Sequence, residues 1–249
     1  MILLLDIGNT NTHLGLATHK RVVKQANIPT ASWSNKKASK LVSRFIGKQR
    51  LEGAMLCSVV PRATSLAASA LKKNFGIQCL QLNPKTVRGV GIAYPRPQSI
   101  GPDRLANAVA AHEHYGASAV VVDFGIVVTF DVVDARGNYV GGIIAPGLAA
   151  MTDYLHEKTA LLPRIKVREI KTVVGKSTEQ AMLIGAVHGY RALIAGLIRQ
   201  LKSQLKTNRL PVIATGGYAK LISSGLREIT AIDPLLTLEG LRLTWLRHQ

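Results

Sequence analysis

The stretch from Leu3 to Leu16 constrains the fold more than any other part of the chain. An apolar run ends at Asp6, breaks at Gly-Asn-Thr-Asn-Thr and then becomes apolar again, which is the pattern of a strand, a tight turn and a second strand. Gly8 would let the backbone approach a ligand closely, and the polar residues after it could donate hydrogen bonds to a phosphate. Because Asp6 would repel that phosphate, we expect a cation between them. An ordinary β-hairpin is the alternative interpretation.

A second copy of this pattern favours a ligand site. The two copies share three positions at a constant offset close to half the chain: Asp6 and Asp123, Gly8 and Gly125, Thr12 and Thr129. An internal repeat of that length indicates a duplicated domain. The sequence therefore predicts an α/β protein in which two Asp-x-Gly hairpins face each other across a central cleft.

Length and composition agree with two domains of ordinary size. The chain has 249 residues, of which 47% are hydrophobic, enough to fill two cores. We predict a division into residues 1–115 and 116–249. No apolar run reaches the ~18 residues of a membrane span, and the N-terminus leads directly into a strand, so we expect no membrane segment, no signal peptide and a cytoplasmic location. Cys57 and Cys79 lie in apolar surroundings, which favours reduced core residues over a disulfide.

The charge balance is unusual. Thirty-two Lys and Arg against fourteen Asp and Glu give a net charge of +18, which attracts polyanions without specifying which. Part of the excess recurs every four residues in a predicted helix: Lys36, Lys40, Arg44 and Lys48. Leu41, Val42 and Phe45 form the apolar side that we expect opposite this stripe. A solvated helix face is the simpler interpretation, and a nucleic-acid surface is the alternative, although no recognised nucleic-acid motif accompanies the stripe.

Alternating strands and helices follow the first hairpin. Periodicity predicts strands over residues 21–26, 54–60 and 77–82 and a helix over residues 63–75. Residues 83–100 contain three prolines, so we expect an exposed loop, and this loop carries Tyr94.

The sequence Gly101-Pro102-Asp103-Arg104 marks the start of another helix, whose small residues suit close packing. Asp103 could simply stabilise the positive end of this helix. Alternatively, Asp103 could take a proton from a substrate hydroxyl while Arg104 holds a carboxylate or phosphate. Position alone does not separate these two roles.

Taken together, these motifs resemble those of type III pantothenate kinases over nearly the whole chain. Seven elements occur in the order of that family: Asp6-Ile-Gly-Asn-Thr, Gly101-Pro-Asp-Arg, Asp123-Phe-Gly, Gly141-Gly142-x-x-Ala-Pro-Gly147, Gly175-Lys-Ser-Thr178, Ala214-Thr-Gly-Gly217 and Asp233-Pro-Leu-Leu-Thr-Leu-Glu-Gly-Leu241. The resemblance implies an actin and hexokinase-like fold of two ribonuclease H-like halves. It implies ATP-dependent phosphorylation of pantothenate to 4'-phosphopantothenate, the first step of coenzyme A synthesis. It also implies a homodimer, with a helix over residues 179–201 as the expected interface.

The resemblance assigns roles to particular residues. The ATP phosphate loop would comprise Asp6, Ile7, Gly8, Asn9, Thr10, Asn11, Thr12 and His13. The pantothenate site would comprise Tyr94, Gly101, Pro102, Asp103, Arg104 and Thr178, with Asp103 as the catalytic base. Asp123 would bind a potassium or ammonium ion that the family uses alongside Mg²⁺, and Gly216 and Gly217 would approach the adenosine. Positioned cations and hydrogen-bond donors are what phosphoryl transfer requires.

One position departs from the family pattern. Where the family usually has Thr three residues after the cation-binding Asp, this chain has Ile126. The lost hydroxyl removes a hydrogen bond worth roughly 0.5–1.5 kcal/mol, and the bulkier side chain could crowd the phosphate, so we expect weaker ATP binding, which Thr129 could partly offset. A degenerate kinase that acts as a ligand-binding or transcription accessory factor is therefore the main alternative. Another sugar or small-acid kinase of the same fold is a third.

Two features look like sites but predict none. Gly175-Lys176-Ser177-Thr178 matches the end of a phosphate-binding P-loop, but Ile170 stands where that motif requires its first Gly. His112 and His114 lie two residues apart without Cys or paired acids at ligand spacing, so we interpret them as surface helix residues and not as metal ligands.

Overall fold

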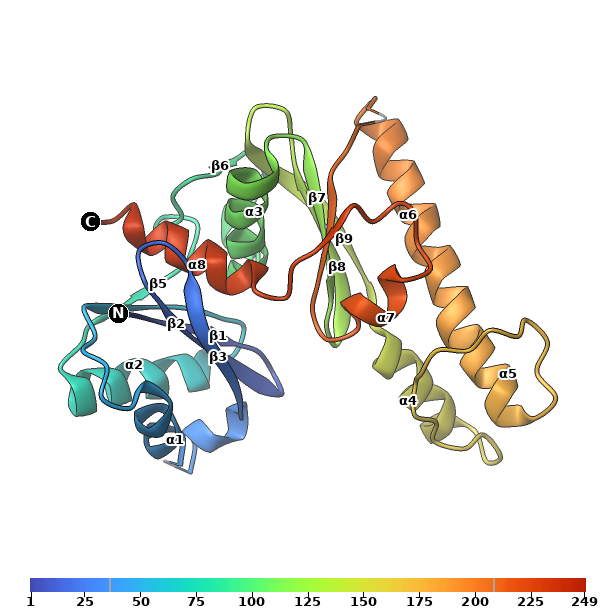
Figure 1. Cartoon of the computed structure of the whole chain (residues 1–249), viewed down its shortest axis with the longest axis horizontal. Coiled ribbons are helices and arrows are strands. Elements are labelled where there is room, and N and C mark those ends of the chain that lie inside the picture. The colour runs from blue at the N-terminus through green and yellow to red at the C-terminus, as the bar shows by residue number, and fades with distance from the viewer. Residues whose placement is uncertain (36, 208) are drawn as a thin grey trace. The chain divides into compact units, whose positions relative to one another are not determined.

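The computed structural model describes residues 1–35, 37–207 and 209–249 and groups them into two compact units (Figure 1). Unit 1 comprises Met1–Gly116, Gly137–Val140 and Leu235–Gln249, and unit 2 comprises Ala117–Arg136 and Gly141–Pro234. The end of the chain thus groups with unit 1 by its contacts. The division into one domain of residues 1–115 and a second of residues 116–249 stays a prediction, and so does a cleft between the two hairpins.

Unit 1 is built on a five-stranded sheet in the order β3-β2-β1-β4-β5. Its strands are β1 (Ile2–Ile7), β2 (Asn11–Ala17), β3 (Val22–Pro29), β4 (Gly53–Ser58) and β5 (Cys79–Gln81). The first three strands pair antiparallel, and β4 and β5 continue the sheet in parallel with β1. The three predicted strands after the first hairpin are confirmed as β3, β4 and β5.

Helices cover both faces of this sheet. Alternate residues of β1, including Leu3 and Leu5, share a core with α1 (Lys37–Ile46) and α2 (Pro61–Phe75). The opposite face meets α8 (Leu236–Leu246), whose Leu238 and Trp245 side chains lie against the glycines of β2 and β4. α8 in turn packs along α3 (Pro102–Tyr115). Short segments complete the unit: η1 (Thr30–Trp33), β6 (Gly91–Ile92) and η2 (Pro97–Ser99).

Unit 2 repeats the same topology. Its strands are β7 (Ala119–Phe124), β8 (Val127–Val133), β9 (Asn138–Pro146), β10 (Val212–Thr215) and β11 (Ala231–Ile232). The first three residues of β9 group with unit 1. They follow the order β9-β8-β7-β10-β11, with β6 next to β9. As in unit 1, the first two strands pair antiparallel and the last two continue in parallel. Two sheets with the same strand order confirm the predicted α/β fold of duplicated ribonuclease H-like halves.

The helices of unit 2 include one that is long and apolar. α4 (Leu148–Lys158) and α7 (Ala219–Ser223) are short, whereas α5 (Thr178–Ile184), a π-helical segment (Gly185–Gly189) and α6 (Tyr190–Gln204) run on as one helix. By length and composition this helix could cross a bilayer, and 44% of its most apolar window is buried in the protein. Buried Arg191 on this helix bonds Glu169 and the carbonyl oxygens of α7, as expected of a core helix.

Three local expectations need correction. α1 ends at Ile46, so Lys48 lies beyond the helix, and Leu41 is 37% exposed although it was expected on the buried side. Lys36, the first residue of the predicted stripe, is outside the described residues. The third correction concerns the repeat: Thr12 is not equivalent to Thr129 in strand register, because Ile7 pairs with Thr12 whereas Phe124 pairs with Val128. Both cysteines are free, with Cys57 buried and Cys79 half-buried.

Candidate active site

Asp6 lies at the carboxyl end of β1, on the sheet face that α8 covers. It is directly opposite His13 on β2 and Cys57 on β4. The Cys57 thiol donates a hydrogen bond to Asp6 Oδ1 over 3.3 Å. Sequence analysis missed Cys57. Its place in the predicted strand of residues 54–60 could have suggested it, because the carboxyl ends of parallel neighbours meet at one sheet edge.

The turn after Asp6 is held by its own backbone and by η1. The Gly8 amide donates to the Asn11 carbonyl oxygen over 3.0 Å. Thr30 then fixes the turn twice: its amide donates to the Thr10 carbonyl oxygen at 2.9 Å, and its hydroxyl donates to the Gly8 carbonyl oxygen at 2.7 Å. The side chains of Asn9, Thr10 and Asn11 are exposed. A braced backbone with exposed polar side chains is suited to hold an anion at little ordering cost.

Two residues of the predicted phosphate loop point into the core instead. Ile7 and Thr12 are fully buried. Because the Thr30 hydroxyl already donates to Gly8, the Thr12 hydroxyl must donate to Thr30, and it accepts from the Trp33 indole over 3.1 Å. The Thr12 hydroxyl is therefore occupied within the protein and braces the loop from behind.

Asp103 occupies the first turn of α3, which begins at Pro102 as predicted. Its Oδ1 accepts a hydrogen bond from the Arg104 amide at 2.9 Å. A Cβ atom on Gly101 would lie 2.5 Å from this oxygen, closer than real contacts allow. The Gly-Pro-Asp-Arg sequence thus places the Asp103 carboxylate at the helix start, and any side chain at position 101 would displace it.

Asp6 and Asp103 share one electrostatic environment. Burial, with the charge of Asp103 added to it, raises the pKa of Asp6 to about 7, and the Cys57 hydrogen bond only partly opposes this. Burial also raises the pKa of Asp103, against the opposing Arg104 amide and guanidinium. Asp6 and Asp103 are both half-buried, and the charge of Asp103 raises the proton affinity of Asp6, so a cation between them would stabilise the ionised pair. These residues therefore fit a hydrated divalent ion, which takes one or two carboxylates and keeps several waters.

An aromatic and cationic cluster lies beside the start of α3. The Arg104 guanidinium sits over the Tyr139 ring at 5.7 Å from its centroid, and the Tyr94 ring meets Tyr139 edge-on at 6.0 Å. Tyr94 also lines a surface depression with Pro95, Arg96 and Ser99. Sequence analysis missed Tyr139, since it belongs to a segment assigned to the second half. The cluster offers a fixed cation and apolar walls, which suit a small carboxylate.

Unit 2 carries the second acid of the repeat at the equivalent strand end. Asp123 pairs with Thr129 on β8 and with Thr215 on β10. Gly216 follows with φ of +89°, and a Cβ atom there would lie 2.5 Å from Asp123 Oδ1 and against the Phe124 backbone. Only glycine adopts this backbone conformation readily and leaves room for the Asp123 carboxylate, so the turn can approach Asp123 closely.

The turn after Asp123 has two residues, Gly125 and Ile126, between β7 and β8. The Gly147 amide donates to the Ile126 carbonyl oxygen at 3.1 Å, and a Cβ atom on Gly147 would collide with that oxygen. The Ile126 side chain is 53% exposed. Its replacement by a smaller side chain would therefore leave the core of unit 2 intact.

Thr178 also belongs to unit 2, as the first residue of α5. Ser177 caps this helix by accepting from the Gln180 amide at 3.2 Å, and the Gln180 side chain accepts from the Lys176 amide at 2.9 Å. The Gly175 to Thr178 sequence is thus a reciprocal helix cap, in agreement with its rejection as a P-loop.

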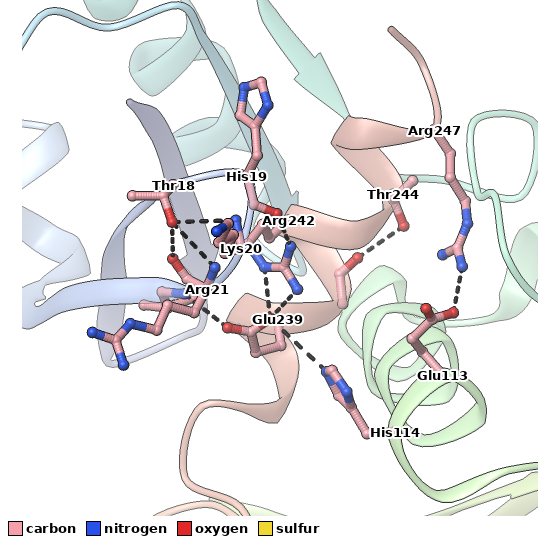
Figure 2. A network of polar contacts seen from close by, with 12 residues as sticks. Thr18, His19, Lys20, Arg21, Glu113, His114, Glu239, Arg242, Thr244 and Arg247 are labelled. Atoms are coloured by element: carbon pink, nitrogen blue, oxygen red, sulfur yellow. Dashed lines mark hydrogen bonds and ion pairs between the residues drawn. The ribbon is translucent and has the colours of Figure 1, made fainter.

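The histidines of α3 also have structural partners. His112 Nδ1 bonds the Gly89 carbonyl oxygen at 2.9 Å, and His114 Nε2 lies 3.9 Å from Glu239 (Figure 2). Glu239 on α8 accepts from the Val22 amide and from Arg242, so it ties α8 to the β2–β3 turn. Within the described ranges, no group of three His, Cys, Asp or Glu could hold a metal.

Comparison with known proteins agrees with this architecture. The family model described as type III pantothenate kinase matches residues 2–200. A type III pantothenate kinase of Akkermansia muciniphila is 44% identical, over 97% of this chain and 96% of that protein. One of Methylacidiphilum infernorum is 43% identical, over 97% of this chain and 87% of that protein. A Campylobacter jejuni structure named for the Baf family of transcriptional activators shares the fold at a TM-score of 0.63 and 20% identity, over 99% of this chain and 98% of that one. The chain belongs to the type III pantothenate kinase family.

Proposed function

We propose that this chain phosphorylates pantothenate with ATP to give 4'-phosphopantothenate, the first step of coenzyme A synthesis. Family membership supports the activity, and the observation that carries it to particular residues is the pair of half-buried carboxyl groups with raised pKa, Asp6 and Asp103. Phosphoryl transfer needs a base for the attacking hydroxyl and positive charge near the phosphates. The raised pKa of Asp103 suits it to act as this base, and a cation shared by Asp6 and Asp103 would supply the positive charge.

Asp103 is the proposed base. As the pantothenate hydroxyl oxygen bonds to the γ-phosphorus of ATP, the bond to the ADP oxygen breaks and the hydroxyl proton passes to Asp103 Oδ2. Oδ1 is meanwhile oriented by the Arg104 amide. Because burial raises the proton affinity of this carboxyl group, it accepts the proton more readily than an exposed Asp would.

The Arg104 cluster is the proposed anchor of the substrate. Arg104 is the residue whose charge would pair with the pantothenate carboxylate, while Tyr94 and Tyr139 flank it. Gly101 and Pro102 would contribute backbone and shape at the start of α3. We assign Thr178 of unit 2 to the same substrate.

Asp6 and the braced turn are proposed to receive the ATP phosphates. When bound, Mg²⁺ would neutralise phosphate charge, and Asp6 is the residue that would hold it or its water shell. The Gly8 amide holds the turn through the Asn11 carbonyl oxygen, and Gly8 would let the phosphates approach the backbone. The amides and side chains of Asn9, Thr10 and Asn11, together with His13, would contact the phosphates, while Ile7 and Thr12 would act from the core side.

Unit 2 supplies the remaining proposed contacts. Asp123 would bind a potassium or ammonium ion, and the Gly216-Gly217 turn would approach the adenosine. We further propose a cytoplasmic homodimer that pairs through the helix of residues 178–204, in which the π-helical segment lies. Light scattering of the purified chain tests the dimer.

A coupled ADP-release assay with pantothenate and ATP, with and without potassium, tests the function. Turnover that requires pantothenate is expected. ADP release that does not depend on pantothenate, or no release at all, would contradict the proposal and favour the alternative, a degenerate kinase that binds ligand or acts as a transcription accessory factor. The observation that favours this alternative is Ile126, whose aliphatic side chain stands where the family usually has the hydroxyl of a Thr.

A further inference from the structure

The positive charge of the chain is concentrated in one part of unit 1. Between Asp6 and Asp103 there are fifteen Lys and Arg but a single acid, Glu52. Glu52 is already paired, with the N-terminal amine at 3.0 Å and with His19 at 2.9 Å. Nearly a hundred consecutive residues therefore carry no acid available to neutralise their basic side chains.

Many of these basic side chains share one surface, which we call the basic face. They project from α1 and α2 and from the segment after α1, and all are exposed: Lys37, Lys40, Arg44, Lys48, Arg50, Arg62, Lys72 and Lys73. α1 and α2 cover the same side of the sheet (Figure 1), where their buried residues meet those of β1 and β4. Across the described residues, none of these eight side chains forms an ion pair.

The basic face is not explained by the proposed kinase site. Asp6 points to the sheet face that α8 covers, whereas α1 and α2 lie on the other face, with Leu5 and Ile7 between them and the strand. A substrate held by Asp6 and Asp103 would therefore be separated from the basic face by the sheet.

Helix stability does not explain it either. Lys37 and Lys40 are three residues apart on α1, and Lys40 and Arg44 are four apart. Like charges at these spacings destabilise a helix by roughly 0.2–0.5 kcal/mol per pair. An acid at any of these positions would relieve that repulsion, so the pattern is the one expected if an external polyanion supplies the countercharge.

The composition of the basic face distinguishes between polyanions. The exposed large apolar side chains of α1 and α2 are Leu41 and Leu66, each 37% exposed. No aromatic ring is among them, and single-stranded nucleic acid is held largely by stacking on aromatic rings. Helices that lie on membranes bury a broad apolar side, but here the apolar sides of both helices are buried against the sheet. A regular row of phosphates is the partner that fits.

We propose that the basic face binds double-stranded DNA through its phosphate backbone, without sequence preference, as a function separate from the kinase reaction. Side chains on two helices of one layer can contact phosphates along a duplex, and such contacts give affinity but no base readout. The salt dependence of binding then reports how many contacts are made.

The test is fluorescence anisotropy of a labelled duplex of about 20 base pairs, titrated with the full-length protein over a range of salt concentrations. The variant combines Lys37→Gln, Lys40→Gln and Arg44→Gln. The matched control combines Lys166→Gln, Lys171→Gln and Lys220→Gln, which removes the same charge from exposed positions of unit 2. The basic-face variant should bind roughly tenfold or more weakly, and its slope of log K against log salt should be shallower by about 2–3, at roughly 0.9 per lost phosphate contact. The control should bind like the parent.

Three results would overturn the proposal. Equal weakening of both variants would mean that diffuse net charge attracts the duplex, and absence of duplex binding by the parent would remove the function. The third is binding to anionic phospholipid vesicles but not to the duplex, which would make the basic face a membrane surface.

Pantothenate kinase turnover and thermal melting are measured in parallel. Unchanged melting shows that the variants are folded even if the kinase proposal fails, and lower turnover in the basic-face variant alone would tie this face to the substrates.

Discussion

The two Asp-x-Gly hairpins have the same topology but different chemistry. In unit 1 the turn between β1 and β2 has three residues, its side chains are polar, and Asp6 at its base is half-buried and feels the charge of a second acid, Asp103. In unit 2 the turn between β7 and β8 has two residues, and exposed Ile126 and Val127 occupy its tip. Gly216 packs against Asp123 there.

This difference suggests a division of labour after duplication. The first hairpin lies in the unit that holds both half-buried carboxyl groups and the Arg104 cluster, which suits proton transfer and divalent-ion binding. At the second hairpin, glycines pack closely: a Cβ atom on Gly216 would collide with Asp123, and one on Gly147 with the Ile126 carbonyl oxygen. A monovalent ion and a nucleoside would suit that setting.

If unit 1 carries the acid–base chemistry, Asp103→Asn should lower kcat by roughly 10²–10⁴-fold, because an amide cannot take the hydroxyl proton. Glu113→Gln is the matched control, since Glu113 lies at the other end of α3 and pairs with Arg247 at the surface (Figure 2). Steady-state kinetics with both substrates measures the effect, and thermal melting verifies the fold. Near-normal turnover of Asp103→Asn would remove Asp103 from the mechanism.

Asp6 should make the ligand-free protein less stable as the pH rises. Its pKa is about 7 in the folded chain against 3.8 ordinarily, so the folded state holds a proton that the unfolded state releases, and stability falls between about pH 4 and pH 7. Asp6→Asn should remove this loss, so its melting temperature relative to the parent should rise by several °C from pH 5 to pH 8. Scanning calorimetry at both pH values measures the difference, and turnover should be lost.

Glu52→Gln serves as a control of opposite sign. The His19 hydrogen bond, the N-terminal amine and their charges hold the pKa of Glu52 below its ordinary value, so Glu52 stabilises the fold above that range and loses the effect as the pH falls. The control should therefore melt slightly lower than the parent at pH 8. A parent and an Asp6→Asn variant with parallel pH profiles would show that Asp6 is ionised in the folded protein throughout this range.

The contribution of unit 2 should appear as a cation requirement. Replacing potassium by sodium in the assay should lower the rate by about tenfold or more, a loss of at least ~1.4 kcal/mol in transition-state stabilisation. Asp123→Asn should be slow in either salt. Equal rates of the parent in potassium and sodium would mean that Asp123 has another role, and the contrast between the hairpins would then lie in the nucleotide contacts alone.

The duplicated hairpin could be predicted from the sequence because it depends on the types of a few neighbouring residues. An acid after an apolar run, followed by glycine, fixes a strand end and a turn in both halves, and Pro102 fixes the start of α3. The strand register of the second hairpin could not be predicted in this way. The constant sequence offset aligned Thr12 with Thr129, but the second turn is one residue shorter than the first. A shift of one residue places every later side chain of the strand on the opposite face of the sheet.

Contacts between segments that are far apart in the chain could not be predicted from the sequence either. Nothing local indicates that the last helix returns to unit 1, where a Cβ atom on Gly240 would collide with the Ala106 carbonyl oxygen. Tyr139 was missed for the same reason, since its partners Tyr94 and Arg104 lie far from it in the chain. Cys57 was within reach, because strand pairing alone places it beside Asp6.

The smallest expected effect belongs to the turn that distinguishes the hairpins most clearly. Ile126→Thr restores the hydroxyl that the family usually has at this position, and since Ile126 is 53% exposed, the change should leave the fold unaltered. The KM for ATP should fall by up to roughly tenfold, the ~1.4 kcal/mol that one hydrogen bond and relieved crowding could supply, whereas the KM for pantothenate should stay the same. Val127→Thr, at the equally exposed neighbouring position, controls for a general gain in polarity. Calorimetric titration of ATP into the parent and both variants separates binding from turnover. A parent that turns over normally and gains nothing from Ile126→Thr would show that the second hairpin tolerates an aliphatic tip. The hairpins would then differ in turn length and buried charge, and not in the hydroxyl groups that they offer to ATP.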